Sequence, residues 1–162
     1  MNNFVIHSLF IFLLVSHPLI SGQPVSHYPS INSETQLVEK AIHTCIGWAK
    51  NKDLEQLYKV IPNDTSFIEV HPNEKIVKGF EEFKKAEKFW MSPDFKAIRY
   101  KIRDLKISFS KSGEVAWFFC MLDDINEWKG QPANWENTRW TGVLEKRNGQ
   151  WVIVQQHFSF AQ

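Results

Sequence analysis

A histidine and a serine, His157 and Ser159, end the last β-type run of the chain and could carry out acid–base chemistry. Because side chains alternate along a strand, one face of this run would carry Trp151, Ile153, Gln155, His157 and Ser159, and would therefore grade from apolar to polar. An imidazole at the polar end can accept or deliver a proton near neutral pH, and Ser159 could orient it or bind a ligand. The alternative for His157 is a core histidine that is hydrogen-bonded to a neighbour.

An arginine in the preceding β-type run, Arg139, could bind a carboxylate or an enolate oxygen through its guanidinium fork. Whether it faces His157 depends on the hairpin turn at Asn148-Gly149. A two-residue turn would put Trp140 opposite His157, whereas a three-residue loop with a bulge would bring Arg139 opposite His157. The alternative for Arg139 is a structural ion pair with Asp123 or Glu69.

Two adjacent carboxylates, Asp123 and Asp124, end another β-type run. Alternation sends one of them to the inner face of the sheet, where poor solvation would raise its pKa and make it a possible general base. Asp123 shares the parity of Trp117 and Phe119 and is therefore the predicted inner residue. The alternative is that both carboxylates are solvated residues at the end of a strand.

Four aromatic side chains would line a ligand cavity if the alternation holds: Tyr100, Trp117, Phe119 and Trp151. The alternative is that they pack in the core. The histidines and acidic residues lack the spacing of a metal site, and the chain has neither a glycine-rich phosphate loop nor a nucleophile elbow. The sequence therefore predicts a small-molecule ligand and predicts no metal and no cofactor.

The composition is that of one globular domain with a short additional segment at its N-terminus. The chain has 162 residues, a formal net charge of +1 and an aromatic content of 14%. A balanced charge gives no electrostatic footprint for nucleic acid or for an anionic membrane. The two cysteines, Cys45 and Cys120, are too few for a disulfide framework and are predicted to be buried free thiols.

The N-terminal segment has the pattern of a secretory signal peptide. No charged side chain precedes Glu34, and an apolar run covers residues 4–15. This run is too short for a membrane span, so we expect a signal peptide over residues 1–22, a linker over 23–32 and a secreted or periplasmic domain over 33–162 without a stable membrane span. The alternative is an uncleaved N-terminal anchor.

Apolar spacing predicts about three helices followed by a sheet. The helices are expected over residues 34–50, with a capping box at Ser33 and Gln36, over 53–60, with Asp53 at its start, and over 80–90. The β-type runs are 65–71, 76–77, 95–109, 114–124, 138–147 and 150–159. A parity switch near Asp104 predicts a β-bulge that bends the longest strand. The predicted fold is α+β, with a curled antiparallel sheet wrapped around the helices.

Several motifs, taken in order, resemble the SnoaL-like branch of the NTF2-like superfamily. They are Trp48-Ala49-Lys50-Asn51-Lys52-Asp53-Leu54, Gly79-Phe80-Glu81-Glu82-Phe83, Gly113-Glu114-Val115-Ala116-Trp117, Arg139-x-Thr141, Asn148-Gly149-x-Trp151-x-Ile153 and His157-x-Ser159. The resemblance implies a cone-shaped barrel that dimerises through the outer face of its sheet. It also implies a pocket that serves cyclases, isomerases, dehydratases and epoxide hydrolases, alongside members that only bind or scaffold. The family pattern favours an inward Arg139, and hence the bulged loop.

Three functions follow as hypotheses. The first is a domain that binds a small, largely apolar molecule in the aromatic cone. The second is an enzyme of the cyclase, isomerase or dehydratase kind, in which His157 or Asp123 moves a proton and Arg139 stabilises the oxyanion. The third is an interaction module that dimerises through an exposed sheet face made of Val152, Val154, Phe158 and Phe160.

Overall fold

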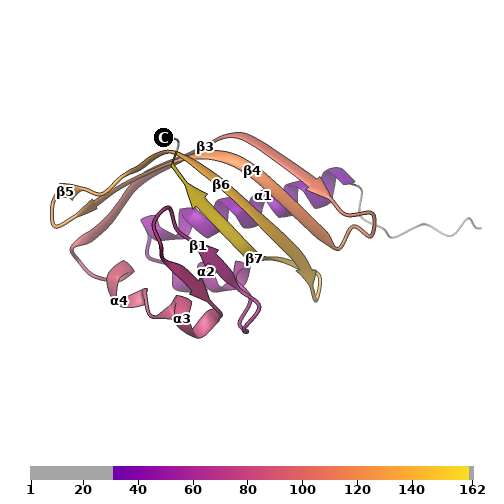
Figure 1. Cartoon of the computed structure of the whole chain (residues 1–162), viewed down its shortest axis with the longest axis horizontal. Helices are drawn as coiled ribbons and strands as arrows, with labels where there is room; N and C mark the ends of the chain where they lie inside the picture. The colour runs from indigo at the N-terminus through magenta and orange to yellow at the C-terminus, as the bar shows by residue number, and fades with distance from the viewer. Residues whose placement is uncertain (1–30, 161–162) are drawn as a thin grey trace, which may run out of the picture.

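One strongly curled sheet dominates the computed structural model, which describes residues 31–160 (Figure 1). The strands lie in the order β2-β1-β7-β6-β4-β3, and the short β5 pairs with β4. β1 and β7 run parallel, whereas the other neighbours are antiparallel, so the sheet is mixed at one pair and not purely antiparallel as predicted. The strands are β1 (Ile68–Val70), β2 (Ile76–Lys78), β3 (Phe95–Phe109), β4 (Val115–Trp128), β5 (Gln131–Pro132), β6 (Trp135–Arg147) and β7 (Gln150–Ser159).

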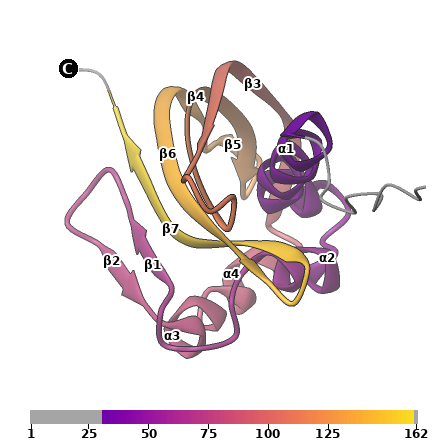
Figure 2. The same cartoon turned by 90° about the vertical axis from the view of Figure 1, so that its right-hand side faces the viewer.

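The helices lie on the concave side of this sheet, which curves around α1 (Figure 2). They are α1 (Ile31–Gly47), the 3-10 turn η1 (Trp48–Lys50), α2 (Leu54–Val60), α3 (Phe80–Lys84) and α4 (Glu87–Trp90). α1 contacts both β3 and β7, so it fills the curl from within. No helix within residues 31–160 is long and apolar enough to cross a membrane. The predicted α+β class, with helices against a curled sheet, is confirmed.

Helix boundaries differ from the sequence prediction in two places. α1 begins at Ile31, before the predicted cap at Ser33, and the predicted third helix divides into α3 and α4. α2 begins at Leu54, directly after the predicted start at Asp53, and the Asp53 side chain caps it by accepting a hydrogen bond from the Gln56 amide at 3.1 Å. The predicted signal peptide, residues 1–22, lies outside the described residues, as do linker residues 23–30.

The core lies between α1 and the concave sheet face. Val38, Ile42 and Cys45 follow the helical spacing and are buried in α1, where they meet buried side chains of the sheet. Both cysteines are buried and free, as predicted. Burial raises the pKa of the Cys120 thiol to about 12, which keeps this side chain a protonated, apolar component of the core.

Bulges decide which side chains face inward. The predicted bulge of β3 is present, with Asp104 at φ 54° and a register shift between Arg103 and Lys106. A second bulge lies in β7, because Leu144 pairs with Ile153 while Val143 pairs with Gln155. Val154 is therefore an extra residue, and the inward parity changes as the strand passes it. Before the bulge Trp151 and Ile153 are inside, and after it Gln156 and Phe158 are inside.

The hairpin between β6 and β7 has a two-residue turn. Arg147 pairs with Gln150, and Asn148 and Gly149 have φ values of 51° and 80°, as a type I′ turn requires. The predicted three-residue loop is therefore wrong. Because the β7 bulge shifts the register again, the residue opposite His157 is Thr141, and Arg139 pairs with Ser159.

Gly142 permits a close approach in the middle of the sheet. A Cβ atom at this position would lie 2.5 Å from Phe118 Cε1 and 2.8 Å from the Gln155 carbonyl oxygen. We expect Gly142→Ala to lower the free energy of unfolding by about 1–3 kcal/mol, because either the ring or the strand backbone must move. Urea unfolding followed by circular dichroism measures this loss. A loss below about 0.5 kcal/mol in Gly142→Ala would contradict the close-approach explanation.

Candidate active site

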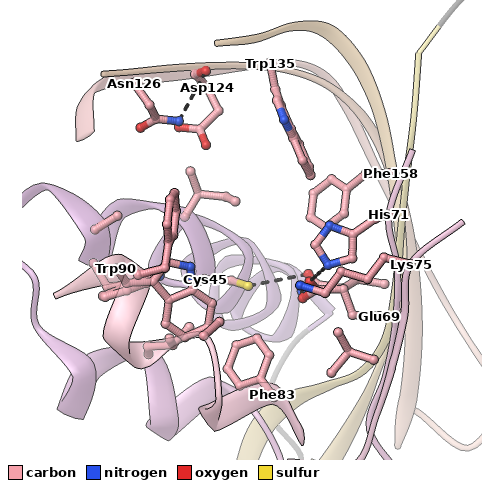
Figure 3. Close-up of a pocket in the computed structure, with 18 of the residues that line it drawn as sticks. Cys45, Glu69, His71, Lys75, Phe83, Trp90, Asp124, Asn126, Trp135 and Phe158 are labelled. Carbon is pink, nitrogen blue, oxygen red and sulfur yellow. Dashed lines mark hydrogen bonds and ion pairs between the residues drawn. The ribbon is translucent and has the colours of Figure 1, made fainter. Parts of the chain in front are cut away.

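A cavity of about 600 Å³ opens between the concave sheet face and the helices (Figure 3). Aromatic rings form much of its wall: Trp48 and Trp90 meet edge to face with centroids 5.3 Å apart, and Trp135 and Phe158 do so at 5.3 Å. The polar or ionisable side chains that reach it are Cys45, Glu69, His71, Lys75, Glu82, Lys85, Asp124, Asn126 and Gln156. The sequence predicted a cavity, but it did not predict that most of these polar side chains would line it.

A chain of polar side chains connects β1, β7 and α1 at one end of this cavity. Glu69 Oε1 lies 2.5 Å from His71 Nε2, and Gln156 Nε2 donates to Glu69 Oε2 at 2.6 Å. The Cys45 thiol in turn donates to Gln156 Oε1 at 3.5 Å. Glu69 and Gln156 are register partners in the parallel pair of β1 and β7, which explains why they meet. Burial and the negative charge of Glu69 raise the pKa of the Cys45 thiol, so it remains a donor.

The Glu69–His71 pair had a signal in the sequence. Residues two apart in a strand point to the same face, so Glu69-Val70-His71 places a carboxylate beside an imidazole. Figure 3 draws Nε2 of His71 toward Glu69 and the other ring nitrogen, Nδ1, on the side of Phe158 and Trp135. The imidazole also meets the Trp135 ring edge to face, with centroids 5.9 Å apart. The carboxylate and this ring contact together fix the orientation of the imidazole.

Asp124 is the acidic side chain of β4 that faces the cavity. Burial raises the pKa of its carboxyl, and the side-chain amide of Asn126 offsets part of that rise. Trp135 lies across from Asp124 in the register of β4 and β6. In Figure 3 Asp124 lies at the opposite end of the cavity from His71. The cavity therefore has a carboxyl with a raised pKa at one end and an imidazole beside a carboxylate at the other.

Asp123, the predicted inner carboxylate, faces the opposite side of the sheet. It accepts hydrogen bonds from Arg103 at 3.2 Å and from the Asn137 amide at 2.8 Å. These bonds, from Asn137 first and Arg103 second, lower the pKa of Asp123. The prediction of an inward Asp123 is wrong, because β4 alternates in the other phase, with Phe118 and Leu122 inside.

The phase of β4 also moves two predicted ligand-binding rings outward. Trp117 and Phe119 lie on the convex face with 48% and 38% of their surface exposed. Arg139 is likewise on the convex face and exposed, since its neighbour Trp140 is fully buried inside. The structure therefore brings none of these three side chains to the cavity.

His157 and Ser159 were predicted to face the pocket, but both lie on the opposite, convex face of the sheet. Both follow the β7 bulge, and Gln156 and Phe158 occupy the inward positions instead. His157 is half-buried beside Thr141 on the convex face, and Ser159 is half-buried beside Arg139. The expected set of His157, Asp123 and Arg139 is thus absent from the cavity wall, and the geometric basis for its catalytic role is lost.

Tyr100 and Trp151 do face the concave side, but they are not part of the cavity wall. The Tyr100 hydroxyl lies 3.1 Å from His43 Nδ1, against α1. Trp151 is 4% exposed, and its Nε1 donates to Glu34 Oε2 at 2.7 Å. For both residues the alternative of core packing describes the contacts.

The four residues predicted to form an exposed dimerisation face, Val152, Val154, Phe158 and Phe160, do not form one exposed surface. Val152 and Val154 are 8% and 9% exposed, so they offer little free surface, and Phe158 lines the cavity. Phe160 is 46% exposed but packs beside Trp135, with ring centroids 5.9 Å apart. Trp117 and Phe119 are instead the two large apolar side chains that stand exposed on the convex face of β4.

Within residues 31–160 no group of three metal-ligating side chains lies together.

Known proteins share this architecture. The family model for the SnoaL-like domain matches residues 38–162. A candidate dehydratase of the NTF2-like family from Streptomyces avermitilis superposes with a TM-score of 0.69 at 16% identity, covering 81% of this chain and 98% of that one. An NTF2-like protein from Cytophaga hutchinsonii gives 0.64 at 12% identity, with 78% and 98% covered.

A candidate calcium/calmodulin-dependent kinase II association domain from Exiguobacterium sibiricum gives a TM-score of 0.66 at 9% identity, with 83% of this chain and 97% of that one covered. A comparison with curated protein sequences finds no match. At these identities the solved structures establish the fold alone. The family model covers most of the chain, and the protein therefore belongs to the SnoaL-like domain family.

Proposed function

We propose that the domain binds a small, largely apolar molecule in the aromatic cavity and moves a proton on it. One observation carries this proposal: Asp124 and the Glu69–His71 pair lie at opposite ends of the same cavity in different environments. Pairs of titratable groups whose surroundings differ in this way commonly divide the roles of acid and base. The reaction class is then an isomerisation, cyclisation or dehydration of the kind that needs one acid and one base.

The size and lining of the cavity support the binding part of the proposal. About 600 Å³ is within the usual range for sites that enclose a small organic molecule. The rings of Trp90, Trp135 and Phe158 offer flat apolar surfaces, and Asp124 and His71 lie at opposite ends of the cavity. Such a wall favours a compact ring system over an extended polar chain.

His71 is suited to the role of base. Nε2 lies 2.5 Å from Glu69 Oε1 without the alignment of a hydrogen bond, and the negative charge beside it favours the tautomer that carries its proton on Nε2. Nδ1 is then an acceptor on the side of Phe158 and Trp135. Glu69 would also stabilise the imidazolium that forms when His71 takes a proton. Burial raises the pKa of Asp124, so its carboxyl is a better candidate to donate a proton to an oxygen of the ligand than a solvated carboxyl would be.

Deuterium exchange into 2-tetralone, a bicyclic apolar ketone, tests the proposal. We expect the protein to accelerate exchange of the protons next to the carbonyl, as followed by proton NMR in D₂O. His71→Gln and Asp124→Asn should each slow this exchange by about 10²–10⁴-fold, the usual contribution of a general acid or base. The fold should survive Asp124→Asn, because this change removes a carboxyl whose charged form is disfavoured by burial.

The convex face supplies matched controls for that experiment. His157→Gln and Asp123→Asn make the same chemical changes outside the cavity wall, so they should leave the exchange rate within about twofold of wild type. If 2-tetralone binds but no exchange occurs above the buffer rate, the protein is a binding domain and the catalytic half of the proposal fails. A loss of exchange in His157→Gln would instead support His157, the residue that the sequence predicted, as the acid–base group.

A second candidate function is self-association through the convex face. We propose a homodimer there because Trp117 and Phe119 stand exposed side by side in β4, at the edge of a groove shared with Thr141 and Val143 of β6. Exposed aromatic pairs of this kind are typical of interfaces. The double variant Trp117→Lys with Phe119→Lys should be monomeric by light scattering, whereas Phe160→Lys should stay dimeric. A monomeric wild type at high protein concentration would contradict this proposal.

A further inference from the structure

The side-chain amide of Gln156 bridges a strand and a helix at the His71 end of the cavity. Gln156 is 3% exposed, and the bulge at Val154 turns it inward. Its Nε2 donates to Glu69 Oε2 at 2.6 Å, and its Oε1 accepts from the Cys45 thiol at 3.5 Å. Both polar atoms of this buried amide are therefore in use, one toward β1 and one toward α1.

The two partners favour a single orientation of the amide. An ionised carboxylate such as that of Glu69 only accepts hydrogen bonds, so it requires the N–H side of the amide. Burial first and the negative charge of Glu69 second raise the pKa of the Cys45 thiol, which therefore stays protonated and donates to the amide oxygen. Reversing the amide would place its oxygen against the carboxylate and would leave the thiol hydrogen without an acceptor. The amide is therefore held by contacts at both of its ends.

A carboxylate held in this way keeps its other oxygen at His71. Glu69 is 7% exposed, and its Oε1 lies 2.5 Å from His71 Nε2 (Figure 3). Turning the carboxylate away from the imidazole would break the hydrogen bond between Glu69 Oε2 and Gln156 in a buried environment, which is costly for a charged group. The negative charge beside Nε2 favours the imidazole tautomer that carries its proton on Nε2. Gln156 therefore acts on His71 through Glu69.

We infer that Gln156 is a positioning residue, which holds the Glu69 carboxylate beside His71 and so keeps the imidazole proton on Nε2 and leaves Nδ1 as an acceptor. For the catalytic rate the inference rests on the proposed function, because His71 is the proposed base. The tautomer is a property of the protein without a ligand, so it can be measured separately. An amide that only packed in the core would stabilise the fold and leave the tautomer unchanged.

Long-range ¹H–¹⁵N NMR correlation spectra test the inference, because they show which nitrogen of a neutral imidazole carries the proton. We expect His71 of the wild type to carry its proton on Nε2. In Gln156→Leu, which removes both polar atoms at similar volume, the ratio of the Nε2-protonated to the Nδ1-protonated form should fall at least about tenfold, the equivalent of one hydrogen bond to a charged group. Gln156→Met makes the same test with an unbranched side chain if the leucine variant fails to fold.

Gln155→Leu is the matched control, because it makes the same change one residue earlier, on the groove of the convex face. His71 should keep its proton on Nε2 in this variant. A proton on Nδ1 in the wild type would overturn the inference, and so would an unchanged tautomer ratio in Gln156→Leu or Gln156→Met. The wild-type spectrum alone is decisive in the first case.

Deuterium exchange into 2-tetralone separates this inference from the proposed function. Gln156→Leu should slow the exchange by about 10–10²-fold, less than His71→Gln, and Gln155→Leu should leave it within about twofold of wild type. If the wild type catalyses no exchange, the catalytic half of the proposed function fails, and the tautomer ratios still decide the inference. If exchange depends on His71 but neither the rate nor the tautomer changes in Gln156→Leu, the inference fails and the proposed function stands.

Discussion

Replacing Trp140 by alanine is expected to lower the free energy of unfolding by about 3–5 kcal/mol, as is usual for a large aromatic side chain removed from a core. Trp140 is fully buried, stacks on Phe158 with ring centroids 5.5 Å apart, and meets Phe118 edge to face at 5.0 Å. The loss combines the transfer of the indole to water with the cavity left between these two rings. Urea unfolding followed by far-ultraviolet circular dichroism measures it.

Trp117→Ala is the control for this prediction, since it removes the same side chain from the exposed convex face. Measured at a concentration at which the chain is monomeric, it should cost less than about 1 kcal/mol. Equal losses at the two positions would contradict the inward and outward phases of β4 and β6. Trp140→Phe should retain most of the stability, because the indole Nε1 of Trp140 has no hydrogen-bond partner among the described residues.

Replacing Glu34 by glutamine is expected to lower the free energy of unfolding at pH 7 by about 2 kcal/mol, the usual size for hydrogen bonds to a charged group. Glu34 joins α1 to the terminal hairpin, since its carboxylate accepts from Lys146 Nζ at 2.8 Å and from Trp151 Nε1 at 2.7 Å. Burial acts to raise the pKa of Glu34, but the hydrogen bonds and charge of these two partners outweigh it, and the net pKa is lowered.

The sign of this shift gives the pH dependence. A carboxyl whose folded pKa is lowered contributes stability above its unfolded pKa, for which the ordinary value is 4.5, and loses that contribution as the pH falls through the lower folded value. The difference between wild type and Glu34→Gln should therefore be constant from pH 6 upward and shrink in acid. Glu39→Gln, on an exposed part of α1, should cost less than about 0.5 kcal/mol throughout. A Glu34→Gln difference that is independent of pH would rule out the ionised contact.

The fold could be predicted from the sequence because its main signals are local. The spacing of Val38, Ile42 and Cys45 identified the long helix, and the Asn148-Gly149 turn located the hairpin. The parity switch at Asp104 identified the first bulge, since polar and apolar positions exchange there. Each of these signals depends on residues that are close together in the chain.

The site was harder to predict, because strand phase depends on packing between distant residues. In β4, residues 115–122 are apolar on both faces, so alternation alone does not say which set of side chains faces inward. The prediction that Trp117, and not Phe118, is an inner residue was wrong. In β7 the bulge at Val154 lies between Ile153 and Gln155, and no glycine or proline marks it in the sequence. By contrast, the two-residue spacing of Glu69 in β1 and His71 directly after it indicates a shared face, and both residues do line the cavity.

The extra residue in β7 makes the length of that strand as important as its composition. If β7 paired with β6 without the bulge at Val154, Val143 would pair with Val154, His157 would move to the concave side, and Gln156 and Phe158 would turn toward solvent, with no change in the sequence. Gln156 would then lose Glu69, and the cavity would exchange an amide and a phenyl ring for an imidazole. The presence or absence of this bulge is therefore a route by which related chains could acquire different chemistry on one scaffold, and alignments that slide a gap across residues 152–156 would equate side chains from opposite faces.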